Sequence, residues 1–186
     1  MAFRNDLVQE MKMRKVTFGG ANSLDNFIAR TNDDVGWLRW NKEVTAISTK
    51  FWKTIDTVVM GRKTYEVSVK LGAGAHPGVK NYVFSRTLKK IDDKRIELVS
   101  VDAAEFITEL KRKPGKGICV MGGGLLARSL FEANVIDEVG FNIHPVLLGS
   151  GIPLFHEMSR QIDLELLECK RLSNGCVMVR YRVKKV

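Results

Sequence analysis

Residues 57–66 read TVVMGRKTYE, a buried strand that ends at Gly61 and continues as a helix beginning with Arg62, Lys63 and Thr64. Glycine allows a ligand to approach the backbone closely, and the first amides of a helix lack partners and carry the positive end of its dipole. With basic side chains beside them, these groups favour a bound anion such as a phosphate. Taken alone, the pattern fits an ordinary strand-to-helix connection equally well.

A second glycine turn lies at residues 118–127, which read ICVMGGGLLA. An apolar strand ends at Gly122, Gly123 and Gly124, and a helix is expected to follow through about Ala133. Three glycines leave no side chain between backbone and ligand, which suits a pyrophosphate or a nicotinamide ribose, and we expect Gly123 to need a positive φ. The spacing matches neither of the two common nucleotide fingerprints. Two such turns in a basic chain nevertheless favour a bound nucleotide.

Length and composition predict one domain. The chain has 186 residues, of which 45% are hydrophobic, enough for one core and too few for two ordinary domains. We expect residues 1–13 to be an extension outside the fold and 14–186 to form the domain. No apolar run approaches the ~20 residues that span a bilayer, so no membrane association is expected. The three cysteines form no C-x-x-C pair, which favours reduced thiols and a cytoplasmic location, and the three scattered histidines indicate no metal site.

The net charge of +9 raises the alternative of nucleic-acid binding. However, the basic pairs are dispersed over the whole chain and lack the interleaved aromatics that stack on single strands. Most are expected to lie on solvated faces. A polyanionic cofactor explains Arg62 and Arg86 more simply, so nucleic-acid binding is a minor alternative.

Apolar strands alternate with helical patterns, which predicts an α/β fold. The apolar spacing over residues 35–54 indicates a helix with one buried stripe. Asp102 is placed to cap a helix that runs to about Lys113. Two alternating segments, 164–168 and 177–183, flank the turn Ser173-Asn174-Gly175 and predict a C-terminal β-hairpin.

The ordered set of motifs resembles the dihydrofolate reductase superfamily, and within it the reductase domain of the bifunctional riboflavin-biosynthesis enzymes. The resemblance covers about residues 14–184, nearly the whole chain. It rests on four segments: 60–66, 82–87, the Gly122 to Gly124 turn, and 136–139 followed by 145–155. It implies a three-layer sandwich, with a mostly parallel sheet, an antiparallel C-terminal hairpin and helices on both faces.

The resemblance also implies an NADPH-dependent reductase acting on a small pteridine or pyrimidine heterocycle. Gly61 to Thr64 would meet the adenosine phosphates, and Gly122 to Gly124 with Leu125 and Leu126 would hold the pyrophosphate and nicotinamide half. The 2′-phosphate would be held by Ser85, Arg86 and Thr87. Ala21 and Ile28 belong to the strand and loop that would cover the nicotinamide. In that loop Asn26 replaces the usual glycine, and asparagine tolerates the positive φ expected there.

Hydride transfer to a ring nitrogen also requires a proton. A carboxyl group in an apolar pocket can supply one, because desolvation favours its neutral form. Asp34, close before Trp37, is similar to the acid of dihydrofolate reductases, although Asp33 is adjacent and a role as helix cap is at least as plausible. Asn142 lies on the strand where the family places a polar partner. It could orient the acid or face outward.

Two departures from the family bear on the substrate. Val79 stands where folate reducers carry an arginine that pairs with the folate carboxylate, and valine cannot form that pair. Met121 stands where riboflavin-pathway reductases commonly carry an acidic residue. Dihydrofolate reductase proper and a non-catalytic nucleotide-binding protein therefore remain alternatives. The branch that this chain resembles typically forms homodimers, so a homodimer is expected. The apolar run 146–149 and the C-terminal hairpin offer surface for a dimer interface.

Overall fold

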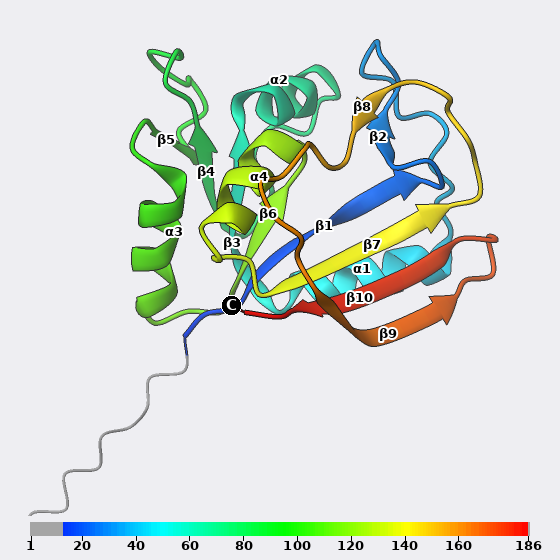
Figure 1. Ribbon diagram of the computed structural model, residues 1–186. Helices are drawn as coiled ribbons and strands as arrows, with labels where there is room; N and C mark the ends of the chain where they lie inside the picture. Colours follow the sequence, from blue (N-terminus) through cyan, green and yellow to red (C-terminus); the bar gives the residue numbers. More distant parts are fainter. Residues whose placement is uncertain (1–12, 186) are drawn as a thin grey trace, which may run out of the picture.

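The structure is a computed structural model that describes residues 13–185 (Figure 1). Its centre is an eight-stranded sheet of order β5-β4-β3-β6-β1-β7-β10-β9. The first six strands in this order are mutually parallel, whereas β10 runs antiparallel to both of its neighbours. The strands are β1 Val16–Ser23, β3 Ile55–Gly61, β4 Lys80–Phe84, β5 Ile96–Val99, β6 Gly117–Met121, β7 Glu138–His144, β9 Leu164–Arg171 and β10 Val177–Val183.

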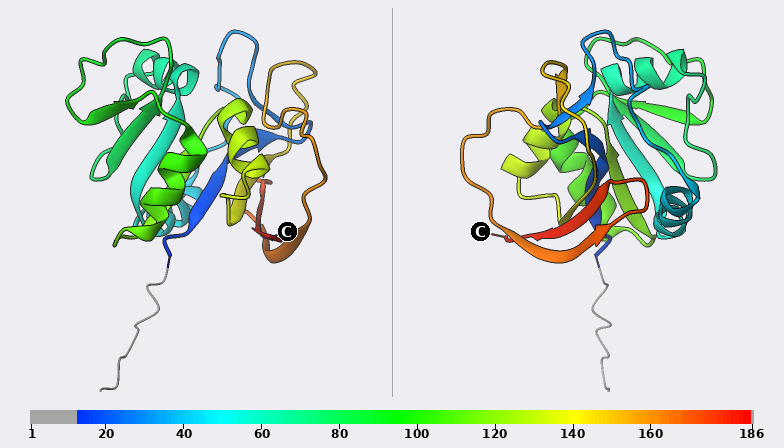
Figure 2. Two further views of the ribbon diagram at one scale, coloured as in Figure 1. Left: turned by 60° about the vertical axis from the view of Figure 1, so that its left-hand side comes forward. Right: turned by 90° about the vertical axis from the view of Figure 1, so that its right-hand side faces the viewer.

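Helices cover both faces of the sheet, as the right-hand view of Figure 2 shows for α4 and α1. One apolar cluster, which includes Phe18 and Phe131, packs beneath α3 (Ala103–Arg112) and α4 (Gly124–Glu132). A second cluster contains Met60 and lies beneath α1 (Lys42–Trp52) and α2 (Arg62–Lys70). The chain thus has the expected α/β three-layer arrangement.

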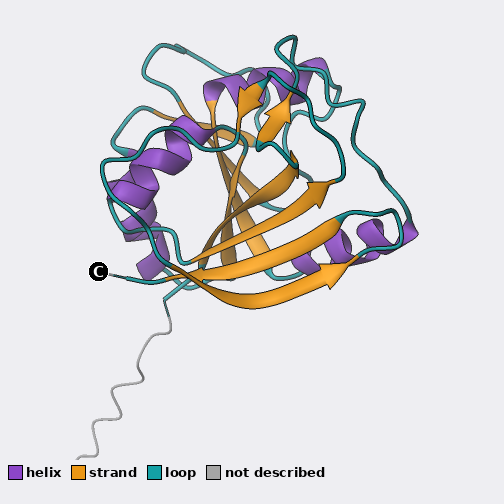
Figure 3. Ribbon diagram, turned by 45° about the vertical axis from the view of Figure 1, so that its right-hand side comes forward, coloured by secondary structure: helices purple, strands orange, loops and turns teal. Residues whose placement is uncertain are grey.

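A small second sheet lies above the ends of β1 and β7 (Figure 3). It pairs β2 (Phe27–Ala29) with β8 (Ile152–Pro153) in antiparallel fashion. Asp25 fixes the neighbouring loop, because its carboxylate accepts the backbone N–H groups of Leu148 and Gly149. Segments that are far apart in the sequence are thereby joined over one edge of the main sheet.

The helix predicted over residues 35–54 is shorter than expected. It begins at Lys42, because Asn41 has extended backbone and its side chain accepts the N–H of Val44. Trp40 is 64% exposed and takes no part in the buried stripe. The predicted cap at Asp102 is confirmed, as is the hairpin of β9 and β10.

The positive φ expected at Asn26 is confirmed at 63°. Of the predicted N-terminal extension, residues 1–12 lie outside the described part of the chain. Within residues 13–185, no helix combines the length and apolar character needed to cross a membrane.

Candidate active site

The predicted phosphate-binding segments meet at one edge of the sheet. β3 lies between β4 and β6, with Met60 aligned with Met121 and Gly61 aligned with Phe84. The carboxyl ends of parallel strands share an edge, so Gly61, Ser85 and Gly122 emerge side by side. The structure therefore brings together three segments that lie far apart in the sequence.

Two helices start at this edge without a side-chain cap. The N-cap residues of α2 and α4 are Gly61 and Gly123, and neither helix receives a capping hydrogen bond from a side chain. By contrast, α1 is capped by Asn41 and α3 by Asp102. The first-turn amides of α2 and α4 consequently have free hydrogen-bonding capacity and a positive dipole end, as an anion site requires.

The glycines of the two turns have different roles. Gly122 has a φ of 76°, and a Cβ there would lie 2.1 Å from Thr64 Oγ1. A Cβ on Gly124 would lie 2.6 Å from His156 Cδ2, so that glycine is required by packing. Gly123 has a φ of −53°, and the nearest atom to its Cβ position is 3.9 Å away.

The expectation of a positive φ at Gly123 was therefore wrong, since Gly122 is the residue with that conformation. A Cβ on Gly61 would likewise meet nothing within 4 Å. The protein itself thus leaves Gly61 and Gly123 open, and a side chain at either position would fill space beside the free amides. This arrangement fits a phosphate-bearing cofactor.

Thr64 joins the two turns. Its hydroxyl accepts the N–H of Gly123 at 3.2 Å, so the first turn of α2 is bonded to the turn before α4. Thr64 was expected to meet the adenosine phosphates together with Gly61, Arg62 and Lys63, and its hydroxyl also links the two helix N-termini. No periodicity in the sequence indicates that link.

The loop after β4 holds the residues predicted to recognise a 2′-phosphate. Ser85 is buried, and its hydroxyl accepts the backbone N–H groups of Thr87 and Leu88. Arg86 and Thr87 are exposed beside it. Arg62 pairs with Glu66 at 2.8 Å, while Lys63 is exposed. Ser85 therefore shapes the loop, and Arg86 presents its charge from it.

The other half of the predicted site lies across β1 and β7. Ala21 is aligned with Asn142 in the parallel ladder, which places these two candidates side by side. Ile28 is partly buried against the main core cluster. In the first turn of α4, Leu126 is also partly buried against that cluster, whereas Leu125 is 64% exposed.

A histidine for which the sequence predicts no role lies at the centre of this half. His144 is 2% exposed, and its Nδ1 accepts the backbone N–H of Arg39 at 3.1 Å. Its Nε2 lies 3.3 Å from the Asn142 amide, and the Trp37 ring meets it edge-on at a centroid distance of 5.3 Å. Burial, and secondarily the charge of Arg39, lowers the pKa of His144.

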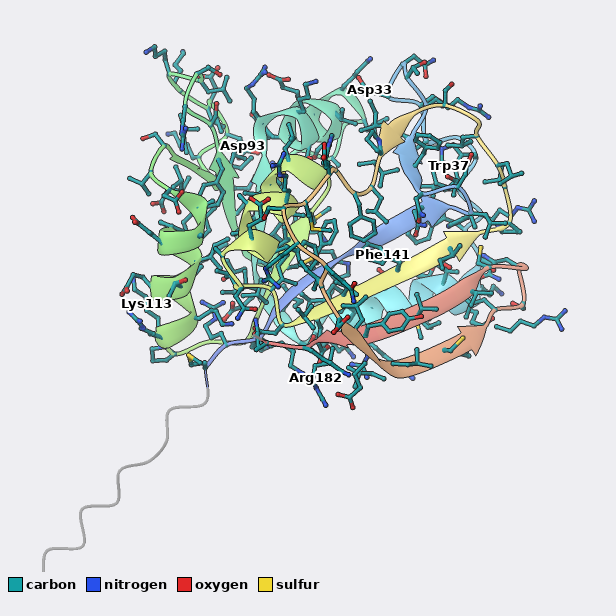
Figure 4. The ribbon with its side chains drawn as sticks, viewed as in Figure 1. Asp33, Trp37, Asp93, Lys113, Phe141 and Arg182 are labelled. Atoms are coloured by element: carbon teal, nitrogen blue, oxygen red, sulfur yellow. The ribbon has the colours of Figure 1, made fainter. Side chains whose placement is uncertain are left out.

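Figure 4 places Trp37 at the end of the sheet where β1 and β7 finish. The one sequence signal for this cluster is that positions 142 and 144 are two residues apart on a strand, so their side chains share a face. Trp37 was expected to lie in a helical stripe, but it precedes α1 and belongs to the cluster instead.

Asp34 does not lie in an apolar pocket. Its side chain is 46% exposed and pairs with Arg30 at 3.2 Å. It also accepts the N–H of Gly36, so it closes a tight turn, and Asn41 rather than Asp34 caps the helix. Asp34 is therefore neither a desolvated acid nor a helix cap, and both predictions about its surroundings were wrong. Asp33 has a φ of 67° in the same turn.

All three cysteines are free thiols, and burial raises the pKa of Cys119 to about 12. Among residues 13–185, no group of three or more His, Cys, Asp or Glu side chains is arranged to hold a metal ion. The chemistry that the described residues offer is thus anion binding at two helix N-termini and hydrogen bonding around His144.

Comparison with known proteins identifies relatives of this chain and structures with a similar fold. The chain is 31% identical to the uncharacterized protein YyaP of Bacillus subtilis, over 94% of this chain and 98% of that protein. A candidate riboflavin-biosynthesis protein of Shewanella sp. PV-4 has a similar structure, with a TM-score of 0.82, 22% identity and coverage of 92% and 99% of the two chains.

Dihydrofolate reductase from Enterococcus faecalis, solved with NADP(H), has a TM-score of 0.66 and 17% identity, covering 92% of this chain and 97% of the other. These two likenesses show the fold. The family assignment rests on the match of residues 14–178 to the RibD C-terminal domain. The chain belongs to the RibD C-terminal domain family, a family of reductases with the dihydrofolate reductase fold.

Proposed function

We propose that this protein is an NADPH-dependent reductase that transfers a hydride to a small pteridine or pyrimidine heterocycle. The observation that carries the proposal is the pair of uncapped helix N-termini on adjacent strands, tied together by the Thr64 to Gly123 hydrogen bond. The structural neighbour from Enterococcus faecalis binds NADP(H) on the same fold, which supports the choice of cofactor.

Each residue of the edge has a role in this proposal. The amides that follow Gly61 and Gly123 would bind phosphate groups, and Lys63 would add charge. Arg86, with Thr87, would contact the 2′-phosphate through charge-assisted hydrogen bonds, in a loop held by Ser85. When bound, the dihydronicotinamide supplies the hydride. Ala21 and Ile28 would border that ring, and Leu125 and Leu126 would flank the turn.

We place the substrate beside Asn142, and we propose Asp34 as the group that exchanges the proton at the rim of the site. Its half-exposed position favours relay from water over donation from a desolvated acid. Val79 packs against the second core cluster, which supports a substrate other than folate, because no cation at that position is available to hold a carboxylate.

The function is tested by following NADPH absorbance while the protein is offered dihydrofolate, pterins and riboflavin-pathway pyrimidines in turn. We expect oxidation of NADPH with an oxo-pyrimidine or pteridine and little with dihydrofolate. Tight NADPH binding without turnover of any of these compounds would favour the non-catalytic alternative. Turnover of dihydrofolate alone would indicate dihydrofolate reductase proper.

We also propose that the protein forms a homodimer through β9. This edge strand is exposed along nearly its whole length, including Leu164 (42%) and Leu166 (55%). An edge strand with apolar side chains favours pairing with a second copy. Sedimentation should show a dimer at micromolar concentration, and Leu166→Lys should convert it to monomer. A monomeric wild-type protein would contradict this.

A further inference from the structure

His156 lies against the start of α4, the helix whose N-terminus we assign to the pyrophosphate. Its Cδ2 atom is 2.6 Å from the position that a Cβ on Gly124 would take, so the imidazole ring touches the backbone of the first residue of that helix. Cδ2 is the ring carbon bonded to Nε2, which can donate or accept a hydrogen bond. A hydrogen-bonding nitrogen therefore lies beside the start of α4.

The imidazole of His156 is the one among the three histidines that is not already engaged elsewhere. His144 receives an N–H group at Nδ1 and faces Asn142 with Nε2, and the ring of His76 is stacked on Trp52 with a centroid distance of 3.6 Å. The ring nitrogens of His156 have no hydrogen-bond partner among residues 13–185, and the residue is only partly buried. Its ring is thus in contact with the protein and accessible to a ligand.

The segment that carries His156 is held in place by the two residues before it. Leu154 is 3% exposed, and its backbone N–H donates to the carbonyl of Asn26, just before strand β2. The ring of Phe155 packs against Phe131 of α4, with 6.3 Å between the ring centroids. Because these contacts fix the chain, the histidine is positioned at α4 before a ligand binds, and less entropy is lost on binding.

The first turn of α4 has no charged side chain of its own. α2 begins with Arg62 and Lys63, whereas the two residues that follow Gly124 in α4 are leucines. The first turn of α4 also contains no acidic residue that would repel an anion. An imidazole N–H beside the free amides would add a side-chain donor there, and a hydrogen bond from it to a phosphate is charge-assisted.

We propose that His156 is a cofactor-binding residue whose imidazole donates to the nicotinamide-side phosphate of the pyrophosphate group. The inference rests on the proposed NADPH-dependent function and adds to it a side chain for which the sequence predicts no role. It assigns the two phosphates to different helices. The amides and cations of α2 hold the adenosine-side phosphate, and the amides of α4 together with His156 hold the other.

The test titrates the full chain by calorimetry with two probes, NADP⁺ and adenosine 2′,5′-bisphosphate. The second probe carries the adenosine-side phosphate and the 2′-phosphate but lacks the nicotinamide-side phosphate. His156→Phe keeps an aromatic ring and removes both nitrogens. It should weaken NADP⁺ binding by about tenfold, because one charge-assisted hydrogen bond is lost, and leave binding of the bisphosphate unchanged. His156→Gln, whose NH₂ group can still donate, should recover part of the loss.

Two further variants separate this role from a general effect on the protein. His76→Gln replaces a histidine whose stacking partner, Trp52, packs on the other face of the sheet, and it should leave the affinity for both probes unchanged. Arg86→Ala should weaken both probes, because each carries a 2′-phosphate. If His156→Phe fails to fold, NMR of the wild type gives the readout. The ring C–H resonances of His156 should shift with NADP⁺ and change little with the bisphosphate, while those of His76 stay in place.

An unchanged affinity of His156→Phe for NADP⁺ would overturn the inference and leave the proposed function standing. An equal loss for both probes would also overturn it, because the substitution would then damage the site as a whole. A wild-type protein that binds neither probe would remove the proposed function itself, and this inference with it.

Discussion

Gly123→Ala should separate cofactor binding from folding. Position 123 has a φ of −53°, and its Cβ position is 3.9 Å from the nearest atom, so alanine fits without strain. Replacing glycine at a compatible position stabilises a protein by about 0.4–1 kcal/mol, whereas an N-cap glycine is better than alanine by roughly the same amount. These effects oppose each other, so the free energy of unfolding should change by less than about 1 kcal/mol.

The cost to cofactor binding should be much larger. The added methyl group would occupy space beside the free amides of α4, where we place the pyrophosphate. A charge-assisted hydrogen bond contributes about 1.5–3 kcal/mol, so displacing two of them should weaken NADPH by ~10²-fold or more. Gly61→Ala, the equivalent change at the start of α2, should act in the same direction.

The assay combines calorimetric NADPH titration with thermal unfolding of each variant. Gly122→Ala serves as the structural control, because its φ of 76° and its contact with Thr64 predict a loss of stability. A Gly123→Ala protein that melts normally and binds NADPH as tightly as the wild type would refute the assignment of this turn.

Three further predictions concern single side chains. Arg86→Ala should weaken NADPH binding by about tenfold or more, because one charge-assisted contact is lost, and should leave NADH binding little altered. Equal losses of affinity for both cofactors would indicate a structural role for Arg86. Asp34→Asn should slow reduction by ~10²-fold without changing NADPH affinity. This factor is at the low end of the range for general acid catalysis, because water reaches the Asp34 side chain and can replace it in part. An unchanged rate would assign the proton to water.

The third concerns the lowered pKa of His144. Below pH ~6.5 the unfolded chain binds a proton that the folded chain resists, so the free energy of unfolding should fall as the pH drops below that value. Urea unfolding at pH 7.5 and 5.5 should show this loss in the wild type and less of it in His144→Gln; identical losses in both would contradict the buried neutral histidine.

The sequence was most informative where one segment determines its own conformation. The strand and glycine turn at Gly61 could be predicted because apolar runs, glycine and helix-forming residues follow one another locally. The start of α1 could not be predicted in this way. The helix begins only after Asn41, which caps it, and Trp37 lies before the helix because it packs against His144, a residue of the distant strand β7. The bond from Gly123 to Thr64 is likewise a contact between segments that no spacing reveals.

The same limit explains the error at Asp34. Its position before a tryptophan resembles a family acid, but its surroundings depend on how the loop that follows β2 folds. In that loop Arg30 and Gly36 engage the carboxylate at the surface. Burial is a property of the folded chain, and a single sequence motif does not determine it.

We propose that the edge formed by Gly61, Arg86 and Gly123 binds NADPH. Calorimetric titration of the wild-type protein with NADPH and NADH tests it most directly. We predict saturable NADPH binding with one site per chain, at least about tenfold tighter than NADH because of the 2′-phosphate contacts. Absence of NADPH binding at millimolar concentration, or equal affinity for the two cofactors, would contradict it.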